Sequence, residues 1–175
     1  LHPVAHSFPT RRSSDLRGAG GRVSYDPNLR LKLWPLDRAR PAILRALAAC
    51  DIALPGLDDA RLFLGLDDAE AIVRAILSMG PGIVALTMGR DGVLLGTDAG
   101  IAQVTTPVVD AVDATGAGDC FDGAFLARLH AGDTAVDAAR YATHAAALST
   151  TGYGAIAPIP DAAAVRRAIE ARAAT

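Results

Sequence analysis

Residues 108–129 read VVDAVDATGAGDCFDGAFLARL, and this stretch predicts the feature around which the rest of the chain is arranged. An apolar run leads into a loop of small residues, 113–119. The segment after the loop carries apolar side chains three and four positions apart, which is typical of a helix: Phe121, Ala124, Phe125 and Leu129. A glycine loop therefore leads directly into a helix N-terminus. The unpaired N–H groups and partial positive charge of such an end favour an anion, usually phosphate.

The carboxylate of Asp119 indicates chemistry as well as binding. It is expected in the first helical turn, among the amides that would hold a phosphate, where a simple binding site gains nothing from a second negative charge. In phosphoryl transfer, a carboxylate takes the proton from the acceptor hydroxyl while the amides hold the moving group. The alternative is an ordinary helix start in which Asp119 only complements the helix dipole. The flanking residues Asp113, Thr115 and 121–123 favour the catalytic interpretation.

Two other glycine loops do not fit this sequence. A P-loop needs Gly-Lys-Ser/Thr, and the only lysine of the chain is the distant Lys32. A dinucleotide-binding fingerprint needs a third glycine where the helix approaches the strand, and Phe121 occupies that position. An NAD-dependent oxidoreductase is therefore disfavoured.

Residues 113–129, DATGAGDCFDGAFLARL, resemble the C-terminal signature of the ribokinase-like (PfkB) carbohydrate kinases. That pattern is D-T-x-G-A-G-D followed by a helix of aromatic and small residues, and here Ala114 replaces a more usual threonine. The resemblance implies Asp119 as the catalytic base and the amides of Gly116, Ala117 and Gly118 as the anion hole. It also implies ATP as the phosphoryl donor, with Mg²⁺.

A second segment, DPNLRLKLWP at 26–35, follows the first predicted strand. A guanidinium such as that of Arg30 can pair a carboxylate through two parallel hydrogen bonds. The segment resembles its counterpart in the 2-keto-3-deoxygluconate kinases of the same family, whose substrate is a sugar acid. The resemblance implies Arg30 and Asn28 as substrate contacts. The alternative is a solvated loop, and Trp34 is expected to pack in the core.

Further site residues follow from the resemblance alone. It implies nucleotide contacts in the loop TMGRDG, in the signature loop and on the helix that would wall the adenine pocket: Thr87, Gly89, Gly92, Thr115, Ala145, Ala146 and Ser149. It implies Asp59 as an Mg²⁺ ligand, in a segment where relatives show N-x-x-E. Asp113, with the turn at Gly154, is a candidate for a monovalent cation such as K⁺. His144 could edge the adenine but is expected on a helix surface, and Val136 is expected on the apolar face of the helix 134–149.

The order of elements predicts the fold class. Strands are expected at 22–26, 51–54, 82–87, 93–95 and 101–105, and helices at 37–49, 58–64, 67–77, after the signature loop, at 134–149 and after Asp161. Helix 67–77 is expected to be capped by Asp67, with Glu70 completing a capping box. Alternating strands and helices predict an α/β fold with a mainly parallel sheet covered on both faces, the last strand pairing antiparallel. The resemblance implies a ribokinase-like three-layer α/β/α domain. It covers residues 22–165 and matches only the C-terminal portion of the family's chain, so the N-terminal part is expected to be missing.

Composition limits the possible partners. The 175 residues carry a net charge of -2, which gives no reason to expect nucleic acid or a membrane surface as a partner. No apolar run approaches the ~20 residues of a membrane span. Two cysteines give no disulfide framework, so a cytoplasmic protein is predicted. Residues 1–16 show no periodicity, and SFPTRRSSDL at 7–16 resembles a translated sequencing adapter. They are predicted to be non-native or disordered, with residues 17–175 forming the kinase portion.

The leading hypothesis is an ATP-dependent kinase that phosphorylates a small sugar or sugar acid, with 2-keto-3-deoxygluconate as the expected substrate. The fragment alone is expected to be inactive, and the full-length form could be a homo-oligomer. Two alternatives stay open: a non-catalytic nucleotide-binding module, and a PfkB kinase for another sugar such as ribose or fructose.

Overall fold

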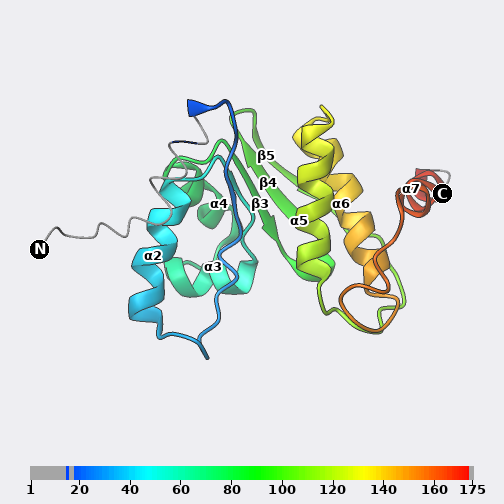
Figure 1. Ribbon diagram of the computed structural model, residues 1–175, viewed down its shortest axis with the longest axis horizontal. Helices are drawn as coiled ribbons and strands as arrows, with labels where there is room; N and C mark the ends of the chain where they lie inside the picture. Colours follow the sequence, from blue (N-terminus) through cyan, green and yellow to red (C-terminus); the bar gives the residue numbers. More distant parts are fainter. Residues whose placement is uncertain (1–14, 16–17, 174–175) are drawn as a thin grey trace, which may run out of the picture. The chain divides into compact units, whose positions relative to one another are not determined.

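The computed structural model describes residue 15 and residues 18–173 (Figure 1). Apart from Asp15, the segment predicted to be non-native lies outside the described residues. The chain divides into two compact units, one comprising Leu1–Leu86 with Gly96–Gly100 and the other Thr87–Leu95 with Ile101–Thr175. The divisions fall within or beside strands of the sheet and not in a linker.

The sheet has five strands in the order β1-β2-β3-β4-β5. Their bounds are Ser24–Tyr25, Ile52–Ala53, Ile83–Thr87, Val93–Thr97 and Gly100–Val104. The β1 and β2 strands pair in parallel, as do β2 and β3, with Ile52 opposite both Ser24 and Ile83. The β4 and β5 strands are neighbours joined by two residues, a connection that only antiparallel strands allow. The predicted α/β fold with a mixed, mostly parallel sheet is confirmed.

The first unit contains three helices: α2 (Leu36–Ala48), α3 (Leu57–Leu64) and α4 (Ala69–Leu77). The cap of α4 differs from the prediction. The Oδ1 atom of Asp68 accepts a hydrogen bond from the Ala71 amide at 2.7 Å, so Asp68 is the N-cap and not Asp67. Glu70 consequently lies too early for a capping box and pairs with Arg74 at 3.3 Å. Both aspartates are good capping residues, and the apolar spacing of α4 does not choose between them.

Pro41 also lies in an unexpected place. Proline is readily tolerated only in the first turn of a helix, but α2 begins at Leu36 and runs through Pro41 in its second turn. A proline there leaves the carbonyl of Asp37 without its helical donor. Pro41 is exposed, so water can replace that donor, while buried Ile43 and Leu47 hold the helix in place.

The second unit contains α5 (Ala117–His130), α6 (Ala135–Ser149) and α7 (Ala162–Ala173). The α5 and α6 helices run side by side (Figure 1). Phe121 and Phe125 of α5 are buried with their rings stacked 5.7 Å apart, and small residues of α6 allow a close approach: Ala138, Ala139, Ala142 and Ala145. Val136, predicted on the buried face of α6, is exposed because it lies in the first turn, before the buried stretch begins at Ala138.

His144 of α6 is buried, with only 3% of its surface exposed, and the predicted surface position is wrong. Its Nδ1 atom lies 2.8 Å from the carbonyl oxygen of Arg140. A carbonyl only accepts, so Nδ1 carries the proton. Nε2 is then a bare acceptor, buried without a hydrogen-bond partner among the described residues. Burial lowers the pKa of His144, and the positive charges of Arg172 on α7 and Arg140 on α6 lower it further.

This histidine should make the second unit sensitive to mild acid. Because the folded protein holds His144 neutral, the unfolded chain binds more protons once the pH falls below the ordinary histidine pKa of 6.5. The free energy of unfolding should therefore be constant above about pH 7 and fall between pH 6.5 and pH 5. Urea denaturation across this range measures it.

The matched variants are His144→Gln and His130→Gln, the latter at an exposed position of α5. His144→Gln should flatten the dependence between pH 6.5 and pH 5, whereas His130→Gln should leave it as in the parent. Equal slopes in the parent and in His144→Gln would show that the folded protein binds a proton at His144 as readily as the unfolded chain does, so that folding does not lower its pKa.

Candidate active site

The loop that precedes α5 is held at both ends. The amides of Val112 and Asp113 donate to the carbonyl oxygen of Thr150, at 2.7 and 3.0 Å. The carboxylate of Asp113 accepts hydrogen bonds from the amide and hydroxyl of Thr115 through Oδ1, and from the amide of Gly154 through Oδ2. The Thr115 hydroxyl, then the amides of Gly154 and Thr115, lower the pKa of Asp113. Asp113 thus connects the signature loop to the turn after α6.

Gly116 is the N-cap of α5 and has a φ angle of +77°, in the left-handed region. A Cβ atom at Gly116 would lie 2.9 Å from the Cβ of Ala155. Both the backbone conformation and the contact require glycine at this position. The turn after α6 and the start of α5 are therefore packed directly against each other.

Three amides at the start of α5 donate no hydrogen bond within the described part of the chain: those of Gly116, Gly118 and Asp119. The amide of Ala117 donates to the carbonyl of Ala114 at 3.1 Å, although it was predicted to belong to the anion hole. The helix dipole adds partial positive charge at the same place. The free amides and the dipole together form a site for an anion.

Asp119 lies in the first turn of α5 with its side chain exposed. A cavity of about 730 Å³ opens beside this turn, and Ala117 and Gly118 form part of its wall. The catalytic hypothesis would fail for an Asp119 buried in the interior beside closed glycines. The structure shows an exposed carboxylate and an open cavity instead.

The cavity lies within the second unit and has a polar and an apolar side. The polar side is the 87–92 loop with Thr106, and the apolar side comes from the segment before the signature loop, from α5 and from α6. The lining residues are Thr87, Gly89, Arg90, Asp91, Gly92, Thr106, Pro107, Val108, Val109, Ala111, Ala114, Ala117, Gly118, Phe121, Thr143, Ala146, Ala147 and Thr150. An apolar slot beside free amides suits a flat base joined to phosphates.

The 87–92 loop keeps its shape through backbone contacts. Gly92 has a φ angle of +88°, and a Cβ atom there would collide with the carbonyl oxygen of Val104. The amide of Met88 donates to the carbonyl of Gly92 at 2.8 Å, and the hydroxyl of Thr106 to the carbonyl of Gly89 at 3.4 Å. These contacts hold the loop as one wall of the cavity.

Of the predicted nucleotide contacts, Thr87, Gly89, Gly92 and Ala146 line the cavity. The remaining three, Thr115, Ala145 and Ser149, do not. Ala145 and Ser149 are each 3% exposed, and the Ser149 hydroxyl donates to the Ala146 carbonyl at 2.8 Å. They are on the α6 face that packs inside the unit.

Several lining residues were missed in the sequence. Thr143, Ala147 and Thr150 share a face of α6 with Ala146, and their spacing of three and four residues could have identified them. Residues 107–111 gave no such signal. They follow β5 as irregular backbone and not as a strand, so a stretch of irregular backbone separates β5 from the signature loop.

The predicted substrate segment lies in the first unit, after β1. Asn28 has a φ angle of +36°, rare for a residue other than glycine. Leu29 is buried, and its amide donates to Oδ2 of Asp59 at 2.8 Å, while Arg30 next to it is exposed. Trp34, expected in the core, is 37% exposed, because the segment from Arg30 to Pro35 runs over the surface.

The two predicted cation ligands are in different surroundings. Asp59 lies in the first turn of α3, where one of its oxygens holds the Leu29 amide. Asp113 holds the signature loop, as described above. Among residue 15 and residues 18–173, no group of three or more His, Cys, Asp or Glu side chains is arranged to hold a metal ion. No helix in this part of the chain has the length and apolar character of a membrane span.

Comparison with known proteins finds a matching family pattern and similar individual proteins. Residues 11–162 match the pfkB family carbohydrate kinase pattern. The chain is 35% identical over 146 residues to a 2-dehydro-3-deoxygalactonokinase of Haloferax volcanii, covering 82% of this chain and 46% of the relative. It also resembles the crystal structure of aminoimidazole riboside kinase from Salmonella enterica complexed with aminoimidazole riboside and an ATP analog, with a TM-score of 0.83 and 30% identity over 91% of this chain and 56% of that one.

A fructokinase from Vibrio cholerae O395, in fructose-, ADP- and calcium-bound form, is equally similar in structure, with a TM-score of 0.83 and 29% identity. The match covers 90% of this chain and 53% of that one. The chain thus spans about half the length of the proteins that it resembles.

The glycines of α5 give a first test of the anion site. A Cβ atom at Gly118 would meet no atom within 4 Å, so Gly118→Ala should leave the free energy of unfolding unchanged or raise it by up to about 1 kcal/mol. The added methyl group would occupy space beside the free amides, so ADP affinity should fall by about tenfold. Urea denaturation and calorimetric titration with ADP measure the two effects.

Gly123→Ala is the matched control, because Gly123 also has open space around its Cβ position but does not line the cavity. It should bind ADP as the parent does. Gly116→Ala should instead destabilise the protein by at least about 1–2 kcal/mol, the cost of a left-handed backbone for alanine before the clash with Ala155 is added. Equal ADP affinity in Gly118→Ala and Gly123→Ala would place the anion elsewhere.

Proposed function

The chain belongs to the pfkB family of carbohydrate kinases, and from this premise we propose that it carries the nucleotide site and the catalytic base of an ATP-dependent sugar kinase. The observation that carries the proposal is the start of α5. Gly118, whose amide is free, lines a cavity of about 730 Å³, and the same turn carries the free amides of Gly116 and Asp119 and the exposed carboxylate of Asp119.

In this proposal Asp119 accepts the proton of the sugar hydroxyl as the oxygen attacks the terminal phosphorus of ATP. The amides at the start of α5 stabilise the negative charge on the transferring group. The apolar side of the cavity, including Val109, Phe121 and Ala147, excludes water from one face of the adenine base of ATP. Asp113 positions the amides without contacting the phosphate, whereas Gly116 starts the helix in its left-handed conformation and also supplies one of the free amides.

The cation roles are proposals of different strength. When bound, Mg²⁺ would neutralise charge on the phosphates. Because the Leu29 amide already donates to one oxygen of Asp59, we assign Asp59 only a contact with Mg²⁺ through a bridging water. Asp113 fits a monovalent cation such as K⁺ better. A carboxylate has about four lone-pair sites, and three hydrogen bonds to Asp113 leave room for a cation beside the turn at Gly154.

We propose that the substrate is a sugar acid, namely 2-keto-3-deoxygluconate, and that Asn28 and Arg30 contact it. Arg30 is exposed, and within the described part of the chain its guanidinium makes only one long hydrogen bond, 3.5 Å, to the carbonyl of Leu29, so it is available to a carboxylate. The similarity to a kinase of 2-dehydro-3-deoxygalactonate supports this choice. The fructokinase supports a neutral sugar as the competing substrate.

Asp119→Asn tests the catalytic role. Because the change removes the base but keeps the shape, kcat should fall by ~10²–10⁴ while ADP affinity stays within about threefold of the parent. A coupled assay of ADP release and a calorimetric titration measure these quantities, on this chain and on any longer product of the same locus. Asp110→Asn, an exposed aspartate near the cavity that does not line it, is the control and should change neither.

Loss of ADP binding with preserved turnover in Asp119→Asn would contradict the assignment. The second candidate function is a nucleotide-binding module without turnover, and the observation in its favour is that the cavity and the free amides of α5 could hold a nucleotide without using the carboxylate of Asp119. ADP binding with no turnover in either product would support that alternative.

Arg30→Gln tests the substrate class. Charge-assisted hydrogen bonds contribute about 1.5–3 kcal/mol, so kcat/KM for 2-keto-3-deoxygluconate should fall by about 10- to 100-fold, with kcat/KM for fructose changed less than twofold. Arg38→Gln, at an exposed position of α2, is the matched control and should affect neither sugar. A parent that prefers fructose, or an equal loss for both sugars, would contradict the sugar-acid proposal.

A further inference from the structure

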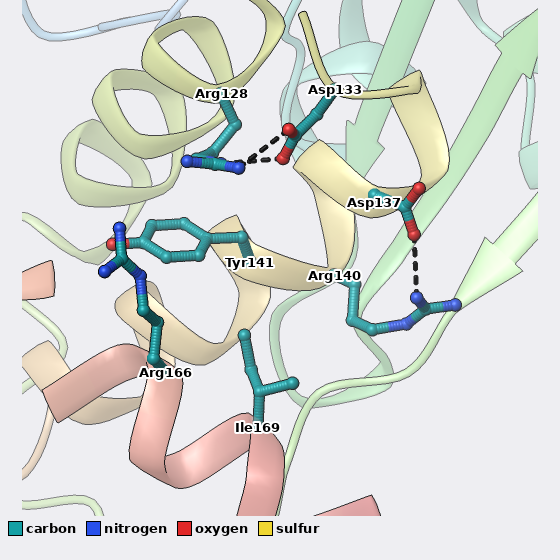
Figure 2. Close-up of a pocket in the computed structure, with 7 residues that line it drawn as sticks. All are labelled: Arg128, Asp133, Asp137, Arg140, Tyr141, Arg166 and Ile169. Atoms are coloured by element: carbon teal, nitrogen blue, oxygen red, sulfur yellow. Dashed lines mark hydrogen bonds and ion pairs between the residues drawn. The ribbon is translucent and has the colours of Figure 1, made fainter. Parts of the chain in front are cut away.

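A second hollow of about 220 Å³ lies in the second unit and shares no lining residue with the nucleotide cavity. Residues from α5, α6, α7 and the α5–α6 connection surround it (Figure 2). They are Arg128, Asp133, Asp137, Arg140, Tyr141, Arg166 and Ile169. Three arginines and two aspartates leave this hollow with one excess positive charge.

The excess charge belongs to Arg166. Both oxygens of Asp133 accept hydrogen bonds from Arg128 at 2.7 Å, and Asp137 pairs with Arg140 at 2.8 Å. The second oxygen of Asp137 is bonded to the hydroxyl of Thr134. Within the part of the chain that the structure describes, Arg166 has no acidic partner within 4 Å. Figure 2 shows its guanidinium directed toward the hydroxyl end of Tyr141.

The surroundings of Arg166 are ordered in advance. The two-bonded pair with Asp133 fixes the guanidinium of Arg128, which lies 5.4 Å from the ring centroid of Tyr141 and so also holds that ring. The half-buried Tyr141 presents its ring and hydroxyl to the hollow, and Ile169 adds an apolar surface. A tyrosine hydroxyl held in place beside a small apolar surface lowers the entropic cost of binding an anion.

The size of the hollow limits the ligand. A volume of 220 Å³ corresponds to about seven water molecules at ~30 Å³ each, which admits a small organic anion but not a nucleotide. We propose that this hollow binds a small oxyanion, a carboxylate or phosphate monoester with a short apolar body, through Arg166 and the hydroxyl of Tyr141. The site is independent of the nucleotide cavity and does not rest on the proposed kinase activity.

The test is a titration of the full 175-residue chain with pyruvate and with methyl phosphate, followed by the backbone amide shifts of the ¹⁵N-labelled protein. Saturable shifts are expected at Tyr141, Arg166 and Ile169, on both sides of the hollow. The two probes separate carboxylate from phosphate as the preferred head group. Chloride at equal ionic strength should not reproduce the shifts.

Arg166→Gln and Arg167→Gln form the matched pair, because both remove one charge from exposed positions of α7 and only Arg166 lines the hollow. Arg166→Gln should weaken binding by about tenfold, Tyr141→Phe by about threefold, and Arg167→Gln by less than twofold. Thermal melting of each variant confirms that the fold is kept. No saturable shift, shifts confined to Gly116–Asp119, or equal losses in the two arginine variants would overturn the proposal.

Discussion

The contact between Gly116 and Ala155 is the constraint on which the candidate site depends. With a φ angle of +77° and no space for a Cβ atom, Gly116 starts α5 directly against the turn that follows α6. Asp113 holds the same two segments together through Thr115 and Gly154. The amides of Gly116, Gly118 and Asp119 are consequently fixed in place without an acceptor in the described part of the chain, which is what a site for a transferring phosphoryl group requires.

The second unit combines two kinds of electrostatic site on the same helices. At the N-terminal turn of α5, backbone amides and the helix dipole supply the positive charge, next to a cavity with an apolar side. At the hollow between α5, α6 and α7, side chains supply the charge. Arg128 and Arg140 are paired with Asp133 and Asp137, so the excess positive charge is that of Arg166. Because the two sites share no residue, each can be changed without altering the other.

His144 shows how the packing of α6 departs from what its composition indicates. An alanine-rich helix gives few clues to which side is buried, because almost every face is small and apolar. The structure buries His144 with its Nε2 unpartnered and exposes Val136, the reverse of the sequence-based prediction for these two residues. Packing against α5 and α7 decided this, and burial then lowers the pKa of His144.

The sequence alone determined the α/β class, the sites of nearly all elements and the glycine loop before α5, because apolar spacing and left-handed glycines are local properties. It did not choose between Asp67 and Asp68 as a cap, nor place Pro41 or Trp34, since these depend on neighbours distant in sequence. Only the tertiary structure brought residues 107–111 and one face of α6 to the loop, and only hydrogen bonding showed that the Ala117 amide is engaged while that of Asp119 is free. A cavity is made by segments distant in sequence, and its walls follow from packing and not from the spacing of any single segment.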